Sequence, residues 1–259
     1  MPAEPDHWSR WLLERRDADD ERQRQVTLEH LAGVRDRILA HGEPLEGSTL
    51  LDVGTGDGLI GLEALARVGP RGRVIFSDVS LALLERVRDA VESQGAAERA
   101  RFVAARAEDL TDIADASVDV VTTRSVLIYV AEKARAFSAM HRVLRPGGRL
   151  SLFEPINRLM FPEPADRFWG YDVSSVAALA DKVKASFDRL EAANAATMMD
   201  FDDRDLARLA ESTGFERVHL ECHIGVSIRS SDSRVSKLSL IKDAGGRPPC
   251  RVTAGLDFN

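Results

Sequence analysis

The sequence predicts a doubly wound α/β fold, in which helices cover both faces of a mostly parallel sheet. Two observations support this prediction. From residue 49 onward, apolar runs of strand length alternate with helical patterns, which is how parallel strands are connected. The first run, Leu50–Val53, ends in a glycine-spaced turn directly before a helical pattern begins. A strand, a tight turn and a helix in this order are typical of nucleotide-binding α/β folds.

The expected elements follow one another in a regular order. A helical segment from Trp8 to Ala40 comes first and precedes the sheet. The core strands are expected at 50–53, 73–77, 101–105, 118–122 and 149–153, and the core helices at 58–68, 81–93 and 132–144. A chain of 259 residues suits one such domain with additions to it.

The residues after the fifth strand form two further segments. Residues 155–200 contain three prolines, a group of aromatic residues and an alanine-rich helical pattern, so we expect an insertion that caps the site. A helix over 203–212 ends at Gly214, and strands are expected over 218–228 and 235–241, with little order from about 244. The expected division is a helical cap (1–42), a core (43–155), the insertion (156–200) and a helix with a strand pair (201–259).

The charge balance and the few cysteines exclude several classes of protein. There are 35 Lys and Arg against 42 Asp and Glu, a formal charge of −7, so a nucleic-acid binder would need a segregated basic face. Cys222 and Cys250 are too few for a disulfide framework or a cysteine metal cluster. The apolar runs are of strand length and the first residues lack signal-peptide features, so we expect a cytoplasmic protein without a membrane partner.

The glycine turn by itself leaves two cofactors open. From Gly56 it approximates the G-x-G-x-x-G fingerprint of dinucleotide folds, whereas from Asp52 it has the spacing of a loop that binds S-adenosylmethionine (SAM). Asp78, at the end of the second strand, suits a ribose in either interpretation. Asp52 favours SAM, because dinucleotide folds usually carry an apolar residue at that position.

A third feature identifies a family. Residues 142–150, RVLRPGGRL, break a helix at a proline and turn through two glycines into a strand. Together with the loop from Asp52 to Gly58, this segment resembles the class I SAM-dependent methyltransferases, over residues 50–154 and more weakly over 206–220. The resemblance implies a seven-stranded Rossmann-like sheet with a helical N-terminal lid and an insertion after the fifth strand. It also implies methyl transfer from SAM to a small organic acceptor, with S-adenosylhomocysteine as the product.

The resemblance assigns the cofactor contacts residue by residue. The implied cofactor-binding residues are Asp52, Gly54, Thr55 and Gly56 at the methionine part, Asp78 at the ribose, Val79, Ala107 and Glu108 at the adenine, and Arg124 near the methionine carboxylate. Arg106 departs from the family pattern, in which an Asp often precedes the Ala-Glu pair and accepts the adenine amino proton.

The acceptor is expected beyond the carboxyl ends of the fourth and fifth strands. Glu154 is a candidate general base or orienting group, with capping of the local backbone as the alternative. Tyr129 either lines the pocket or packs against a helix. The other expected pocket residues are Trp8, Trp11, Ser125, Asn157, Phe161, Trp169 and Tyr171. Nucleic-acid bases are disfavoured as acceptors, because no Asn/Asp-Pro-Pro-aromatic motif follows the fourth strand.

The residues bear on two other possible functions and on a possible metal site. An NAD(P)-dependent oxidoreductase would use Tyr129 and Lys133, but this pair follows the fourth strand directly, a placement that argues against it. A non-catalytic SAM-binding regulator is the second alternative. Strand alternation puts His219 and His223 on one face and Cys222 on the other, so no metal site is expected. The accepting atom and the oligomeric state stay open.

Overall fold

The computed structural model describes residues 4–15, 21–159, 161–168, 171–191, 195–223 and 251–257. Within these residues one sheet has the strand order β3-β2-β1-β4-β5-β9-β8, and a separate hairpin pairs β6 with β7. The strands are β1 Thr49–Val53, β2 Arg73–Asp78, β3 Ala100–Ala104, β4 Val118–Arg124, β5 Leu144–Pro155, β6 Arg167–Phe168, β7 Tyr171–Asp172, β8 Arg217–His223 and β9 Arg251–Asp257.

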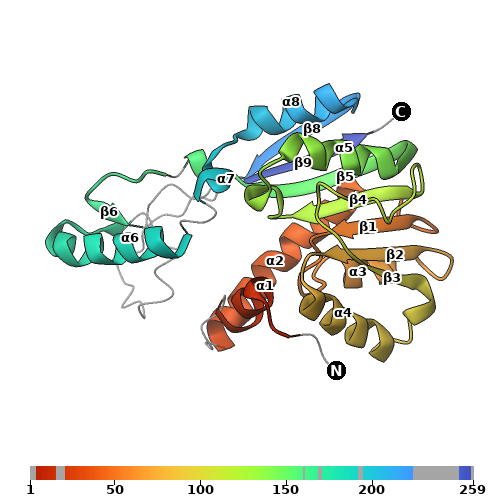
Figure 1. Cartoon of the computed structure of the whole chain (residues 1–259), viewed down its shortest axis with the longest axis horizontal. Helices are drawn as coiled ribbons and strands as arrows, with labels where there is room; N and C mark the ends of the chain where they lie inside the picture. The colour runs from red at the N-terminus through yellow and green to blue at the C-terminus, as the bar shows by residue number, and fades with distance from the viewer. Residues whose placement is uncertain are drawn as a thin grey trace.

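The helices lie on both sides of the main sheet, as expected from the alternation (Figure 1). The α-helices are α1 His7–Arg10, α2 Glu21–His41, α3 Gly61–Arg67, α4 Leu81–Ser93, α5 Lys133–Val143, α6 Ala177–Glu191, α7 Ala195–Met199 and α8 Asp203–Thr213. Short turns of other helix types are η1 Trp11–Arg15, η2 Ala97–Arg99, η3 Leu127–Tyr129, η4 Asn157–Leu159 and η5 Ser174–Val176.

Strands β3, β2, β1, β4 and β5 are parallel, and the core lies on both of their faces. Neighbouring residues of a strand point to opposite faces, so Leu50 packs in a cluster with residues of α2, α3 and α4, whereas Leu51 packs in a cluster with residues of α5 and α8. Both leucines are fully buried. A sheet buried on both faces explains why β1 is a continuous apolar run until Asp52.

Local sequence sets the helix ends well where a cap is present. Helix α4 begins after Ser80, whose hydroxyl oxygen accepts the N–H of Leu83 at 3.2 Å, and its bounds agree with the predicted helix at 81–93. Helix α8 begins at an Asp202 capping box and ends at Gly214, which has a φ of 111°, so the predicted C-cap glycine is confirmed.

The C-terminal strand differs from one expectation, and a second expectation falls outside the described residues. The segment expected to pair with the last long strand, 235–241, lies outside the described residues. The strand beside β8 is β9, which is antiparallel to both β5 and β8 and lies in the tail where little order was expected. The expectation was wrong for 251–257, because hydrogen bonding to strands on both sides orders this segment, and composition does not record that pairing.

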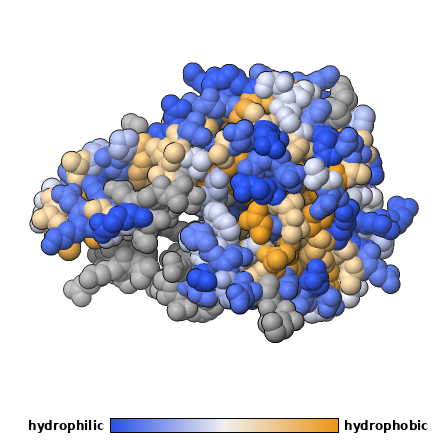
Figure 2. All heavy atoms as spheres, viewed as in Figure 1, coloured by the Kyte–Doolittle hydropathy of each residue, from blue (hydrophilic) through white to orange (hydrophobic). Residues whose placement is uncertain are grey.

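The N-terminal segment and the insertion lie at different distances from the sheet. Helix α6 projects away from the sheet at the left of the view, whereas α1 and α2 lie at the lower centre, beside the sheet (Figure 1). Figure 2 shows mostly hydrophilic residues over α8 and a mixture of hydrophilic and hydrophobic residues over α6. Among the latter, Leu179 and Val183 are exposed.

Candidate functional site

The glycine loop between β1 and α3 is shaped by its backbone. Gly54, Gly56 and Gly58 have φ values of 66°, 58° and 88°, a region that residues with a β-carbon rarely adopt. A β-carbon at Gly54 would also lie 2.2 Å from Cγ2 of Val126, which belongs to the turn after β4. The loop therefore needs glycine both for its dihedral angles and for close packing against that turn.

Asp52 holds this loop from beneath. Its Oδ2 accepts the hydroxyl of Thr55 at 2.7 Å and the N–H of Gly61 at 3.1 Å, and its Oδ1 accepts the hydroxyl of Thr122 at 2.9 Å. Burial raises the pKa of Asp52 to about 6, although these hydrogen bonds act to lower it. The carboxylate is 1% exposed and organises the loop, as expected, through donors of the protein itself.

Asp78 ties the end of β2 to the same loop. Its Oδ2 accepts the N–H of Gly56 at 2.9 Å, and its Oδ1 accepts the N–H of Ser80 at 2.9 Å. Burial raises the pKa of this carboxyl group. The next residue, Val79, is 50% exposed, so an acidic group and an accessible apolar side chain stand side by side at the edge of the loop.

The turn after β3 brings the two expected adenine residues near the end of β2, because β3 is the neighbour of β2 in the sheet. Ala107 is buried, and Arg106 and Asp109 form an isolated β-bridge around it. The guanidinium of Arg106 lies 3.1 Å from the carboxylate of Glu108 and is largely exposed. The residue that departs from the family pattern therefore pairs with its own neighbour.

The end of β4 forms one wall of a hollow of about 230 Å³. Ser125 has a φ of 55°, an unusual value for a residue with a side chain, and donates its N–H to the carbonyl of Phe153 at 2.8 Å. The hollow is lined by Thr27, His30, Leu31, Arg124, Ser125, Phe153 and Pro155. Sequence reasoning found Arg124 and Ser125 but missed the three residues of α2, because only tertiary packing brings that helix to the end of β4.

Glu154 is fully buried and caps the backbone of the same turn. Its Oε1 accepts the N–H groups of Val126 and Leu127 at 2.9 and 3.0 Å, and its Oε2 accepts that of Ile128 at 3.3 Å. Burial raises the pKa of Glu154 to about 7, while these bonds and the charge of Arg124 act to lower it. Of the two roles expected for this residue, backbone capping is the one that has contacts in the structure.

The N-terminal segment touches the site at three places. The side chain of Ser80 acts to lower the pKa of the Asp6 carboxyl group, and the ring of Trp8 packs edge-on against Tyr129 with their centroids 4.7 Å apart. A β-carbon at Gly56 would lie 3.1 Å from Cδ2 of Leu12. Tyr129 thus packs against the N-terminal segment, and Trp11 is 39% exposed nearby in the chain.

The aromatic residues of the insertion are only partly described. Asn157, in η4, is half-buried and accepts the N–H of Phe161 through its carbonyl at 2.9 Å, and Phe161 is itself half-buried. Tyr171 pairs with Phe168 in the β6–β7 hairpin, and Trp169 lies outside the described residues.

Lys133 anchors the end of the insertion to the core. Its Nζ donates to Oδ1 of Asp200 at 2.6 Å and to the carbonyls of Val130 and Thr197 at 2.9 and 3.1 Å. The lysine side chain is 7% exposed. These hydrogen bonds occupy the ammonium group of Lys133 and argue against its pairing with Tyr129 in hydride chemistry.

Among the described helices, none is long and apolar enough to cross a membrane.

Comparisons with known proteins agree with this geometry. A family model described as "Methyltransferase domain" matches residues 51–152. The chain is 33% identical over 200 residues to the ubiquinone/menaquinone biosynthesis C-methyltransferase UbiE of Azotobacter vinelandii, covering 75% of this chain and 72% of that protein. It is also 33% identical over 175 residues to the protein of the same name from Stutzerimonas stutzeri, covering 66% of each.

The fold is similar to that of a solved geranyl diphosphate methyltransferase in complex with SAM. The TM-score is 0.62 with 17% identity, and the alignment covers 95% of each chain. At this identity the likeness concerns the fold, and it agrees with the parallel strand order β3-β2-β1-β4-β5 of the main sheet.

Proposed function

Since the chain belongs to the class I SAM-dependent methyltransferases, which transfer a methyl group from SAM to small molecules, we propose that SAM lies along the glycine loop. The acceptor, in this proposal, enters the hollow beside Arg124. The observation that carries this proposal is the joining of the loop to the end of β2 by the bond from Gly56 to Asp78. It assembles a glycine cradle, a carboxylate and an exposed apolar side chain at one edge of the sheet.

The residues fit the donor in charge and shape. At Gly56 no β-carbon stands between a ligand and the loop backbone, and the nearest atom to the place of such a carbon is Cδ2 of Leu12, at 3.1 Å, in the segment proposed as the lid. Asp78 retains acceptor capacity for ribose hydroxyl groups beyond its two backbone bonds. Val79 is 50% exposed and offers a surface for the adenine ring. In this proposal Arg124, the last residue of β4, supplies a cation for the methionine carboxylate.

The chemistry divides between the donor and the protein. SAM, when bound, supplies a sulfonium methyl group, and the acceptor's electron pair forms the new bond as the carbon–sulfur bond breaks toward sulfur. The protein holds the acceptor in line and excludes water, which can lower such a barrier by about 7–11 kcal/mol. In this proposal Asp52 and Glu154 are positioning residues, because each is buried and bonded to protein donors, and the N-terminal segment is the lid.

The accepting atom is proposed to be carbon. The two relatives compared above are named C-methyltransferases, and the hollow offers apolar walls at Leu31 and Phe153 beside the polar Arg124. An electron-rich carbon that carries a hydrogen, in a ring with hydroxyl groups, fits this combination, and the proton that this carbon loses after methyl transfer is released to solvent. A screen of reduced quinols, phenols and amines with labelled SAM tests it, and methyl transfer confined to nitrogen would overturn the carbon assignment.

The first experiment compares thermal shifts with SAM, S-adenosylhomocysteine, NAD and NADP. A ligand present at 100 times its Kd stabilises the folded state by ~2.7 kcal/mol, roughly 5–10 °C for a domain of this size. We expect that shift with S-adenosylhomocysteine and none with the nucleotides. Asp78→Asn is expected to lose most of the shift, whereas Asp89→Asn, an exposed Asp on α4, is expected to keep it.

Two results would contradict the proposal. Equal ligand shifts in Asp78→Asn and the wild-type protein would remove Asp78 from the donor site. Binding of SAM without production of S-adenosylhomocysteine by any acceptor in the screen would favour the non-catalytic regulator.

A further inference from the structure

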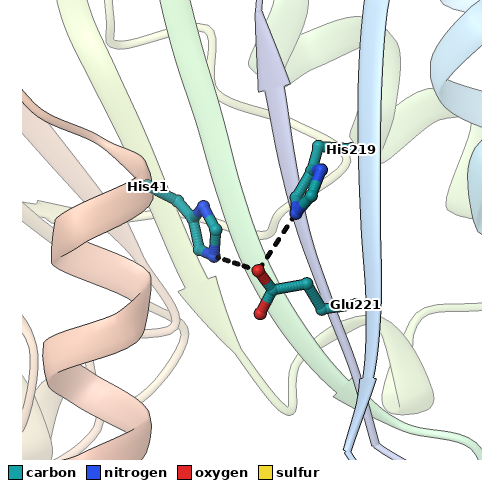
Figure 3. Close-up of side chains that lie close together, drawn as sticks. All are labelled: His41, His219 and Glu221. Carbon is teal, nitrogen blue, oxygen red and sulfur yellow. Dashed lines mark hydrogen bonds and ion pairs between the residues drawn. The ribbon is translucent and has the colours of Figure 1, made fainter.

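Two histidines and a glutamate meet at the far edge of the sheet, away from the glycine loop. His41 is the last residue of α2, and His219 and Glu221 belong to the edge strand β8 (Figure 3). The Nε2 atoms of His41 and His219 lie 3.5 and 3.0 Å from the same oxygen of Glu221, Oε1. The three side chains therefore point toward one shared point between the helix end and the strand.

The backbone explains why these side chains converge. Residues two apart on a strand point to the same face, so His219 and Glu221 stand side by side above β8. Helix α2 runs across β5 and β9 and ends there, which brings in His41 from the other end of the sequence. The sequence-based expectation of no metal site considered His219, Cys222 and His223 along one strand, and that comparison leaves out a ligand from a distant helix.

The spacing of the three groups suits a tetrahedral metal ion. Zinc binds histidine nitrogen and carboxylate oxygen at about 2.0–2.2 Å, and a tetrahedron with such bonds has edges of roughly 3.3–3.6 Å. The two measured nitrogen–oxygen distances are 3.0 and 3.5 Å, and one ligand atom from each of the three residues lies within 4.8 Å of the others. Small side-chain adjustments would place all three around one ion.

The chemistry of the set points in the same direction. Two imidazoles and one carboxylate form the His₂Glu set that proteins use for zinc with a fourth position left to water. The side chains of His41, Glu221 and His219 are 24%, 35% and 61% exposed, so water can reach that fourth position. The carboxyl end of a helix also carries a partial negative charge that favours a cation.

We propose that His41, His219 and Glu221 form a zinc site that links the end of α2 to the sheet edge. Helix α2 also supplies Thr27, His30 and Leu31 to the hollow, so the ion would fix the helix that forms one wall of it. The site lies on a different edge from the glycine loop and does not depend on the assignment of the donor or the acceptor.

The test uses the full chain without a histidine tag, because a tag would bind zinc itself. Isothermal titration with zinc chloride in metal-free buffer is expected to show one ion per chain, and zinc at 100 times its Kd should raise the Tm by roughly 5–10 °C. His41→Asn and Glu221→Gln are each expected to weaken zinc binding at least tenfold. Glu216→Gln, an exposed residue just before β8, removes the same charge and is expected to change zinc binding less than twofold.

Cobalt(II) gives a second measurement that does not depend on the folding of variants. Bound at this site, it should show the visible absorption of a four-coordinate ion without a thiolate charge-transfer band, because the ligand set contains no cysteine. A thiolate band would assign the metal to Cys222 or Cys250 and overturn the proposal. So would absence of zinc binding, or zinc binding that is unchanged in both His41→Asn and Glu221→Gln.

Discussion

Gly54 is the residue at which the glycine loop touches the turn after β4. Its φ is 66°, and an added β-carbon would lie 2.2 Å from Cγ2 of Val126. Val126 donates its N–H to Glu154 and belongs to a turn that cannot retreat easily. The contact between Gly54 and Val126 therefore shapes both the loop and the turn. The conformational preferences of single residues do not describe such a contact.

Gly54→Ala is expected to lower the free energy of unfolding by roughly 2–4 kcal/mol, since it adds a close contact to the ~1–2 kcal/mol cost of the left-handed conformation. It should also remove the thermal shift caused by S-adenosylhomocysteine. Gly95→Ala is the matched control: its φ is 65° and nothing lies within 4 Å of its added β-carbon, so it should show only the conformational cost. Urea unfolding measures both variants, and equal losses would contradict the contact.

Glu154 gives the protein a pH dependence. Its pKa is raised from 4.5 to about 7 by burial, so between these values the folded state holds the proton more tightly than the unfolded state. The free energy of unfolding contributed by this residue is therefore highest below pH 4.5 and falls as the pH rises through 7. Asp52, with its pKa raised to about 6, acts in the same direction at lower pH.

Glu154→Gln cannot titrate and should lose this part of the pH dependence. Between pH 5 and pH 8, the free energy of unfolding of the wild-type protein is expected to fall, relative to that of the variant, by on the order of 2 kcal/mol. Urea titrations at the two pH values measure it. A difference that stays constant would show that the carboxyl group titrates alike in both states.

At the scale of elements, a buried lysine at the start of α5 joins helix α7 to the core, and Met198 of α7 also packs against the core. Lys133 donates to Asp200 and to two backbone carbonyls and also lies over the ring of Phe201 at 4.8 Å. The insertion returns to the core at this point. A buried ammonium with three acceptors fixes one arrangement of α7, because each acceptor would otherwise need another donor.

Lys133→Met keeps most of the side-chain volume and removes the charge, and it should lower the free energy of unfolding by about 2 kcal/mol. Protease cleavage within 195–200 should increase. Lys184→Met is the control, because the Nζ of that half-buried lysine donates to the carbonyl of Ala165 in a solvent-exposed bond, and we expect a change within ~0.5 kcal/mol. If both variants behave alike, α7 is held by other contacts.

At the scale of the whole molecule, β9 joins the parallel part of the sheet to its edge. It pairs from Arg149 to Pro155 of β5 on one side and along all of β8 on the other. A proline inside such a strand removes a ladder hydrogen bond and does not fit a strand with neighbours on both sides.

Thr253→Pro is therefore expected to destabilise the whole chain, by roughly 3 kcal/mol or more, and to favour aggregation through the exposed edges of β5 and β8. Thr253→Val, which suits a strand, should leave the Tm nearly unchanged. Thermal unfolding and size-exclusion chromatography compare the two. Equal stability of the proline variant and the wild-type protein would contradict the central place of β9.

The sequence by itself determined the local elements and the family. Strand-length apolar runs, the Gly214 cap and the Asp52–Gly58 spacing are recorded in consecutive residues, so strands, a helix end and the glycine loop could be predicted. The sequence placed Asp78 at the end of the second strand, but the hydrogen bond that its carboxylate accepts from Gly56 is a finding of the structure.

Only the tertiary structure decided which distant groups meet. In the structure Glu154 accepts hydrogen bonds from the turn that leads into η3, and Lys133 binds residues at α7. Residues of α2 line the hollow, and His41 lies beside the edge strand β8. It also ordered β9 between two strands, against the expectation from composition. These contacts depend on how helices and strands far apart in the chain pack together, and local patterns of residues carry no record of that packing.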